Sequence, residues 1–305
     1  MGTFFLRRLA HSIIVIFGIT LVIFIITHLI GDPVNLLLPP EASQTDREVF
    51  RSQLGLDQPL HIQYLIFLRD AVKGNFGISF RHGRPALELV IDHLPATLEL
   101  TVAAMLISIL LAIPIGILSS VKPGSLLDRT GMTFALFGQS APVFWIGIMF
   151  ILLFGVKLRW FPVSGRGGIE NLIMPAMTLG LFSTAAITRL TRSSMLDVLD
   201  KEYIRTARIK GLPENRVILK HALKNALIPI VTIVALQFGM MLSGAVITET
   251  IFAWPGVGRL AVNAIYNRDY PVVQAAVFVT SVFFIVINFL VDLIYTYIDP
   301  RITYR

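Results

Sequence analysis

The chain has 305 residues, of which 55% are hydrophobic and 15% charged, and its mean hydropathy is +0.74. A soluble domain of this size could not cover its surface with so few polar side chains, so the composition predicts a polytopic membrane protein. The formal charge of +7 would suit nucleic acid, but membrane topology alone accounts for it and we expect no nucleic-acid partner. Cysteine is absent, which excludes disulfides and thiolate chemistry.

Six hydrophobic segments are each close to the ~20 residues that cross a ~30 Å hydrocarbon core. The first follows a basic pair and is too long for a cleaved signal peptide, so we expect it to remain as a span in contact with lipid. The chain is then a single transmembrane domain, residues 1–305, with six transmembrane helices at about 10–30, 96–121, 130–156, 171–195, 226–251 and 271–298.

Between the first two spans lies a long external loop, residues 31–95. Residues 47–54 and 60–73 have helical apolar spacing, and Gly55, Pro59 and Gly74 punctuate them. This pattern predicts an ordered, partly helical cap.

Small side chains recur at intervals of four residues within two spans. They allow helices to approach closely where lipid provides no hydrophobic driving force. We therefore expect helix contacts at Ala104, Ser108, Ala112, Gly116 and Ser120, and at Ala235, Gly239 and Ser243.

The distribution of Lys and Arg predicts the orientation. With a cytoplasmic N-terminus, fifteen of the 26 basic residues fall inside, six on the long outer loop and five on the short outer loops. Because the long loop is largely exempt from the positive-inside rule, both termini and the loop at 195–225 are expected in the cytoplasm.

That cytoplasmic loop, residues 195–225, is long and patterned. Its first half carries apolar residues at helical spacing, which predicts one helical face made of Met195, Leu196, Val198, Leu199, Tyr203, Ile204 and Ala207. Gly211 suits a left-handed helix stop, and Pro213 suits the first turn of a second helix. The basic charge alone is explained by topology, but the helix-Gly-helix pattern indicates a docking surface for a soluble partner.

Several segments together resemble one family. They are EYIRTARIKG at 202–211, LKNALIP at 223–229, GDP at 31–33, LGLDQPL at 54–60, WPGVGRL at 254–260, RDYPVVQ at 268–274 and DPR at 299–301. The first two resemble the ATPase-docking loop of ABC importer permeases, in the dipeptide, oligopeptide and nickel family that also includes glutathione permeases. Two positions differ from the usual pattern: RTA at 205–207 stands where permeases generally have EAA, and Asn75 stands where this family often has Asp.

The resemblance implies a type I ABC importer permease of the first (B-type) subunit. Its expected partners are a second, non-identical permease subunit, two cytoplasmic ATPase subunits and an extracytoplasmic solute-binding protein, in the inner (plasma) membrane of a prokaryote. The resemblance also places ATPase coupling at Glu202, Tyr203, Arg205, Thr206, Ala207 and Gly211.

The chain carries no signature of catalysis. Phosphate-binding loops need a Gly-Lys pair, which occurs nowhere, so ATP and Mg are expected on the partner ATPases and no cofactor on this chain. The six histidines lack metal-ligand spacing, and we expect neither a metal site nor catalytic residues. Ser119 and Lys122 have the spacing of a Ser-Lys acyl enzyme, but a lysine at a span end is better explained by snorkelling.

An ion-coupled secondary carrier is the alternative function. It would need ionisable groups in mid-membrane. Glu99, Arg189, Arg192, Glu249 and Asp292 lie within two or three turns of a predicted span end, where anchoring or helix pairing explains them better.

The sequence therefore favours a permease that works by alternating access and forms half of a translocation path. Peptides are the default solutes, while glutathione, nickel chelates, opines and oligosaccharides remain open. Candidate path positions, equally compatible with helix packing, are Gln139, Ser140, Pro142, Gln237 and Ser243.

Overall fold

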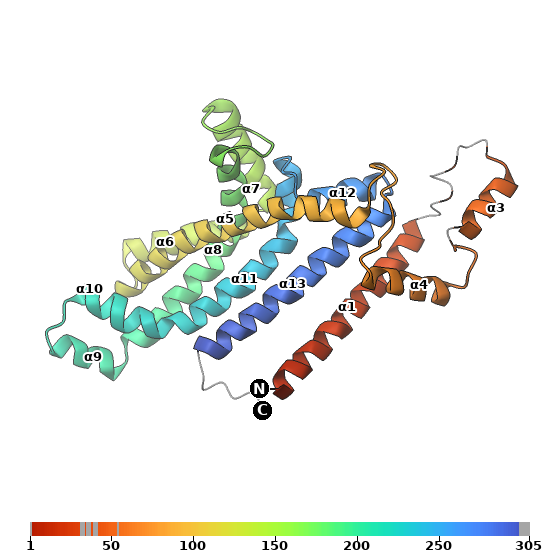
Figure 1. Ribbon diagram of the computed structural model, residues 1–305. Helices are drawn as coiled ribbons and strands as arrows, with labels where there is room; N and C mark the ends of the chain where they lie inside the picture. Colours follow the sequence, from red (N-terminus) through yellow and green to blue (C-terminus); the bar gives the residue numbers. More distant parts are fainter. Residues whose placement is uncertain (1, 31–33, 35–37, 39–41, 54, 299–305) are drawn as a thin grey trace. The chain divides into compact units, whose positions relative to one another are not determined.

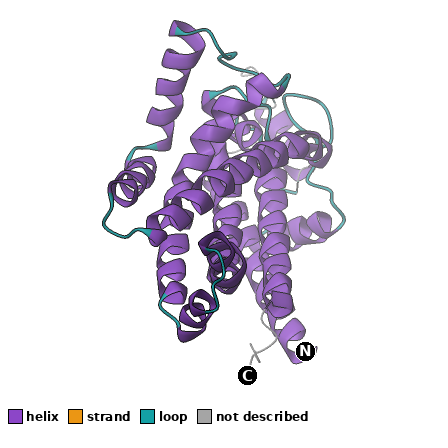
Figure 2. Ribbon diagram, turned by 90° about the vertical axis from the view of Figure 1, so that its left-hand side faces the viewer, coloured by secondary structure: helices purple, strands orange, loops and turns teal. Residues whose placement is uncertain are grey.

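A computed structural model describes residues 2–30, 34, 38, 42–53 and 55–298, and gives the backbone alone for 2–9, 27–30, 50, 53, 243 and 291–298. Helices dominate it, and within the described residues the only β pairing is one isolated bridge between Ile78 and Pro85 (Figure 2). The motifs at 31–33 and 299–301 lie outside the described residues.

The helices follow one another along the chain (Figure 1). In the first half they are α1 (Gly2–Ile30), α3 (Gln44–Gln53), α4 (Leu60–Val72), α5 (Ala86–Val121), α6 (Leu126–Ser140), α7 (Val143–Phe150) and the π-helix η1 (Ile151–Lys157). In the second half they are α8 (Ile169–Leu199), α9 (Glu202–Ile209), α10 (Glu214–Arg216), the π-helix η2 (Val217–Ala222), α11 (Leu223–Ile251), α12 (Val257–Tyr266) and α13 (Tyr270–Ile298).

Four stretches are long and apolar enough to cross a membrane: Ala86–Val121, Ile169–Leu199, Glu214–Leu242 and Tyr270–Leu290. Leu126–Ser140 and Val143–Lys157 together make a fifth if this bent pair is one span, and Ala10–Ile26 is a shorter apolar helix. The expected count of six spans, and their division at the stated boundaries, stay predictions.

The fold of the chain divides into two compact units, and the division falls within α5 and α13. The first unit is Met1–Pro95 with Gly256–Ile285, and the second is Ala96–Pro255 with Val286–Arg305.

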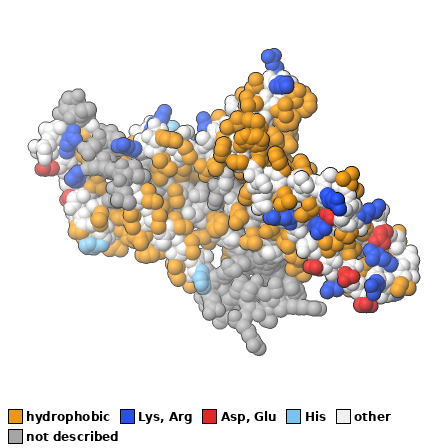
Figure 3. Space-filling model, turned by 180° about the vertical axis from the view of Figure 1, so that it is seen from behind, with side chains coloured by type: hydrophobic (Ala, Val, Ile, Leu, Met, Phe, Trp, Pro, Cys, Tyr) orange, Lys and Arg blue, Asp and Glu red, His pale blue; other side chains and the backbone are white. Residues whose placement is uncertain are grey.

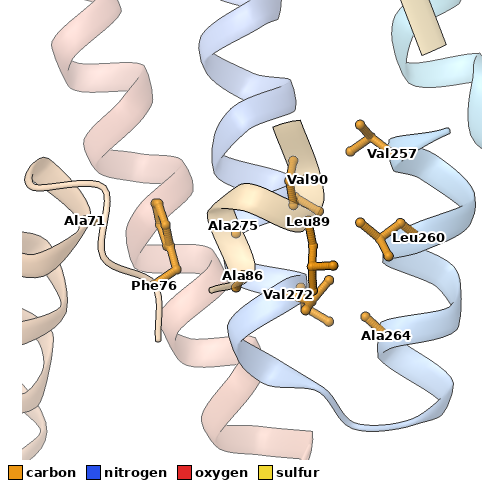
Figure 4. Packing of buried hydrophobic residues seen from close by; sticks show 12 residues of the cluster. Ala71, Phe76, Ala86, Leu89, Val90, Val257, Leu260, Ala264, Val272 and Ala275 are labelled. Atoms are coloured by element: carbon orange, nitrogen blue, oxygen red, sulfur yellow. The ribbon is translucent and has the colours of Figure 1, made fainter. Parts of the chain in front are cut away.

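The first unit has its own apolar core, to which the start of α5, α12 and the start of α13 contribute. Figure 4 shows Leu89 and Val272 lying opposite Leu260 and Ala264 of α12. Phe76 joins this core and stacks against Phe278 with ring centroids 5.1 Å apart. Two glycines end the preceding segments as expected, because Gly55 and Gly74 have φ of 67° and 75°.

A turn over residues 77–85 in the same unit is fixed by one carboxylate. Asp269, 2% exposed, accepts hydrogen bonds from the Ser79 hydroxyl and from the amides of Phe80 (3.2 Å) and Arg81 (3.4 Å). The amide of His82 donates to the Ser79 hydroxyl oxygen at 3.0 Å. Asp269 thus supplies the acceptors that the turn's own backbone cannot provide.

The second unit is built on close packing between α5 and α8. Ser108 donates to the carbonyl of Gly180 at 2.6 Å, and a side chain at Gly116 would meet Thr191 Cβ at 2.6 Å. Ala104 and Ala112 are fully buried. The small side chains of this span make helix contacts, as the spacing predicts.

The predicted span at 130–156 is not a straight helix. Its two halves, α6 and α7 with η1, meet at Ala141 and Pro142 with a bend of 103°. Pro142 has no amide hydrogen and restricts the residue before it to extended backbone, and Ala141 has ψ of 137°. The α7 arm therefore turns away from the direction of α6 and packs against α8 and α11 at Gly147, and its surface is mainly apolar with basic side chains at the tip (Figure 3).

Candidate functional site: the loop between α8 and α11

The loop begins where α8 ends at Leu199. Lys201 is extended, with φ of −76° and ψ of 147°, and α9 starts at Glu202. Asp is a poor helix former, and Asp200 caps α8 instead of continuing it. The expectation of a single helical face from Met195 to Ala207 was therefore wrong: the apolar residues are divided between α8 and α9.

Those residues nevertheless meet in one buried cluster. It joins the last turns of α8, helix α9, η2 and the start of α11, through Met195, Ile204, Ala207, Val217, Ile218, Ala222, Ala226 and Ile230. Met195, Ile204, Val217 and Ala222 are fully buried. Since burying an aliphatic side chain contributes about 1.5–3 kcal/mol, the cluster fixes α9 firmly to the helices beneath it.

Gly211 forms the elbow that the sequence predicts. Its φ is 75°, and its amide donates to the carbonyl of Arg208 at 2.9 Å. The following amide, of Leu212, reaches back to the carbonyl of Ala207. Pro213 then precedes α10, as a proline at a helix start should.

An ion pair spans the elbow. The Arg208 guanidinium donates to Glu214 through Nη2 at 2.7 Å and through Nε at 3.2 Å. Hydrogen bonding to the Glu214 carboxylate raises the pKa of Arg208 above its usual range. Both side chains are half exposed, so the pair adds little to the free energy of unfolding but aligns α9 with α10.

A pocket of about 760 Å³ lies at the base of the loop. It is lined by the end of α5 and by the junction of α8 with α9, including Asp197, Asp200, Lys201 and Arg208. Charged groups of both signs therefore surround the junction.

The exposed face of α9 carries four of the six predicted coupling residues. Glu202, Tyr203, Arg205 and Thr206 are exposed, and the Thr206 hydroxyl donates back to the carbonyl of Glu202 at 3.0 Å. Gly211 is exposed at the elbow, whereas Ala207 is 6% exposed and belongs to the buried cluster.

The sequence analysis does not single out Ile209. Its side chain is 86% exposed at the end of α9, and Tyr203, six residues earlier, is 44% exposed. The exposure of an isolated isoleucine next to a predicted helix stop cannot be predicted from the sequence, because only the packing of α9 in the structure shows which of its side chains remain exposed. The surface of α9 thus includes two exposed apolar side chains, Tyr203 and Ile209, on different sides of the helix, together with charged side chains.

The predicted path residues are found in three places. Gln139 and Ser140 end α6, and Pro142 immediately precedes α7 at the bend. Gln237 is 5% exposed in α11, and its side-chain oxygen has no hydrogen-bond partner in the described part of the chain. Ser243 also belongs to α11, but its side chain lies outside the described residues.

The family models match nearly the whole chain. Residues 112–304 match "Binding-protein-dependent transport system inner membrane component", and residues 1–101 match the corresponding N-terminal model. The chain therefore belongs to the family of inner membrane components of binding-protein-dependent transport systems.

Curated relatives are similar over their full length. The chain is 42% identical to the oligopeptide transport system permease protein AppB of Bacillus subtilis (strain 168). It is 41% identical to the dipeptide permease DppB and 40% identical to the glutathione permease GsiC, both of Escherichia coli (strain K12), and each of the three alignments covers 100% of both chains.

Solved structures share the fold. A chain of the inward-facing MetNI methionine ABC transporter matches with a TM-score of 0.59 at 20% identity, over 69% of this chain and 96% of that one. A chain of an amino acid ABC transporter matches with a TM-score of 0.53 at 18% identity, over 69% and 94%. The fold is that of type I ABC importer permeases, and the chain is a multi-pass inner membrane permease subunit of an ABC importer, which confirms the expected fold class and function.

Proposed function

We propose that this permease forms half of the translocation path of an ATP-driven importer for peptides or a related small solute. The solute arrives on an extracytoplasmic solute-binding protein, and a second, non-identical permease completes the path. Two cytoplasmic ATPase subunits bind ATP and Mg, and this chain supplies no catalytic residue, metal or cofactor. The names of the relatives support peptides and glutathione as the solute class.

One observation supports a role for α9 in coupling to the ATPases. One side of α9 packs into the buried apolar cluster, and Tyr203 and Ile209 are exposed elsewhere on the helix. A helix seated on a packed cluster moves together with α8 and α11, and its two exposed apolar side chains offer contacts to a docking partner. We assign ATPase docking to Glu202, Tyr203, Arg205, Thr206 and Ile209, with Ala207 acting through packing and Gly211 through the elbow. Nucleotide-driven closure of the ATPases would move this helix and, through it, α8 and α11.

Ile209→Ser tests this docking surface. Because the side chain is 86% exposed, folding should be unchanged, while the ATPase subunits should co-purify several-fold less with the permease. Leu126→Ser is the matched control, since Leu126 is 78% exposed at the first turn of α6 and should leave co-purification intact. Equal ATPase recovery in the Ile209 variant would contradict the assignment.

Topology is tested by reporter fusions. Reporters after Lys122, Lys210 and Arg305 should read cytoplasmic, and those after Lys73, Arg166 and Arg268 external. An external signal after Lys210 would remove the basis for ATPase docking.

Dependence on partners separates this proposal from the carrier alternative. The chain purified alone should neither hydrolyse ATP nor take up solute in proteoliposomes, whereas co-expression should yield one copy of each permease with two ATPase units. Gradient-driven uptake by the isolated chain would favour the ion-coupled carrier. A working complex with two copies of this chain and no second permease would contradict the heterodimer.

A further inference from the structure

We propose that Arg189 of α8 and Gln139 of α6 form a binding site for the carboxylate group of the solute in transit. The inference rests on the proposed function for the class of solute. Its physical basis lies in the contrast between two arginines on consecutive turns of α8.

The charge of Arg192 is neutralised by Asp128, at the beginning of α6. Its guanidinium donates from Nε and Nη2 to the two oxygens of Asp128, at 2.7 Å and 2.8 Å. Asp128 also accepts from the amide of Gly124 at 2.8 Å and is 5% exposed. Arg192 therefore has a built ion pair and a structural role.

Arg189 extends in another direction. Its Nη2 donates to Gln139 Oε1 at 2.8 Å, near the last residue of α6. Gln139 follows Asp128 by eleven residues, about 16 Å along the helix axis. The two guanidinium groups thus diverge, and that of Arg189 lies beside the bend between α6 and α7.

The Arg189 site consists of donors without a counter-ion. Arginine has no acceptor, so its contact fixes the Gln139 amide with the oxygen toward the guanidinium and the NH₂ group turned away. Among the described residues, Arg189 makes no ion pair, and the NH₂ group of Gln139 has no hydrogen-bond acceptor. Free N–H groups from a guanidinium and an amide fit an anion, most specifically a planar carboxylate.

The site is also open. Arg189 is exposed although it belongs to a stretch that is long and apolar enough to span the membrane. Exposed residues continue along the same face of α8, at Phe182 seven residues earlier and Ser193 four residues later. A charged side chain in a span faces a water-filled cavity or protein instead of lipid, so this face belongs to the path or to its wall.

The solute explains an unneutralised cation at this point. Oligopeptides, dipeptides and glutathione, the solutes named for the relatives, all carry a terminal carboxylate. A single guanidinium with one amide would hold that group weakly and release it, as passage through a path requires.

The site can be probed without knowing the solute, because the chain contains no cysteine. Ser140→Cys gives this chain one thiol, exposed beside Gln139, and labelling of this chain is followed in the assembled complex. Reaction rates with an anionic and a cationic methanethiosulfonate are compared, each relative to its rate on a free thiol. The anionic reagent should be favoured on the order of tenfold, and adding Arg189→Gln should remove the preference. No preference, or no labelling in the complex, would overturn the proposal.

Transport then tests the ligand class, with a dipeptide and its C-terminal amide each delivered on the binding protein. Arg189→Gln should lower uptake of the free acid on the order of tenfold, leave uptake of the amide at its parental rate, and leave ATPase stimulation intact. Arg189→Lys should restore part of the acid uptake. Arg129→Gln, which removes an exposed charge from the first turn of α6, is the control and should change neither.

Other outcomes are equally decisive. An equal fall for acid and amide, or loss of the second permease on purification, would overturn the carboxylate site and make Arg189 a contact between permeases. If the parental complex transports no peptide, the proposed solute class fails, while the thiol labelling still decides whether the anion site exists.

Discussion

The loop between α8 and α11 and the turn at 77–85 are both polar, exposed segments, yet different forces hold them in place. The loop rests on a cluster of eight buried apolar side chains, among them Ile204 and Val217. The turn depends on one buried carboxylate, Asp269, which accepts from Ser79, Phe80 and Arg81.

The difference lies in how each support fails. An apolar cluster loses free energy in proportion to the volume removed, so its loop weakens by degrees. A buried carboxylate satisfies several donors at once, and its removal leaves all of them without an acceptor. We therefore expect the turn to fail in one step and the loop to fail gradually.

Asp269→Ala should have the largest effect on stability. It removes the acceptor of one hydroxyl and two amides in a buried site, at a cost of about 2–4 kcal/mol in the free energy of unfolding. Thermal unfolding should shift down, and trypsin should cut faster after Arg81 and Arg84. Asp92→Ala is the control, since Asp92 is exposed and forms only a surface ion pair with Arg84. Equal trypsin resistance in both variants would show that the carboxylate does not hold the turn.

Ile204→Ala should lower the free energy of unfolding by as much as Asp269→Ala, about 2–4 kcal/mol, only if the cavity stays open, and by less if the cluster closes around it. The seating of α9 should loosen, and stimulation of ATPase activity by loaded binding protein should fall. The same substitution at Ile209, on the same helix but 86% exposed, should leave the unfolding midpoint unchanged. Similar destabilisation at both positions would mean that α9 is not seated on the cluster.

Gly211→Val should have the smallest effect on folding. Nothing lies within 4 Å of a side chain there, so the cost is the strain of a β-branched residue at φ of 75°, on the order of 1 kcal/mol or more. Gly165→Val is the matched control, because Gly165 has φ of 85° and equally open surroundings. Both variants should lose similar stability, but only the Gly211 variant should lose ATPase stimulation. Parental stimulation in that variant would refute a coupling role for the elbow.

Local signals in the sequence predicted local structure well. Gly55, Gly74 and Gly211 have positive φ where glycine was expected to end a helix. The contacts of Ser108 and Gly116 with α8 follow from the spacing of small residues. Each signal depends on backbone sterics or residue size, which are properties of a single position.

Features that depend on distant residues could not be predicted. Ser79 and Asp269 are 190 positions apart, and no pattern in either segment predicts that the two side chains form a hydrogen bond. Ala207 was expected to take part in coupling on its motif alone, but its place in the buried cluster follows from where η2 packs. Arg189 and Arg192 look alike in sequence, and only the position of α6 separates an arginine neutralised by a carboxylate from one that meets an amide.

The π-helix η2 has a consequence for how this loop can change length. A π turn accommodates one more residue than an α turn, and η2 lies directly between α10 and α11. Because η2 absorbs the extra residue, the helix before it keeps its rotation about the axis of α11, and deleting one residue inside η2 would let the segment return to α-helix with little rotation. A deletion in the α-helical first turns of α11 has no such turn to absorb it and would rotate everything before it by about 100°. Because Val217, Ile218 and Ala222 are all buried, that rotation would expose part of the cluster. Deletions at the start of α11 should therefore be selected against more strongly than a deletion inside η2 or a substitution of the exposed Lys220.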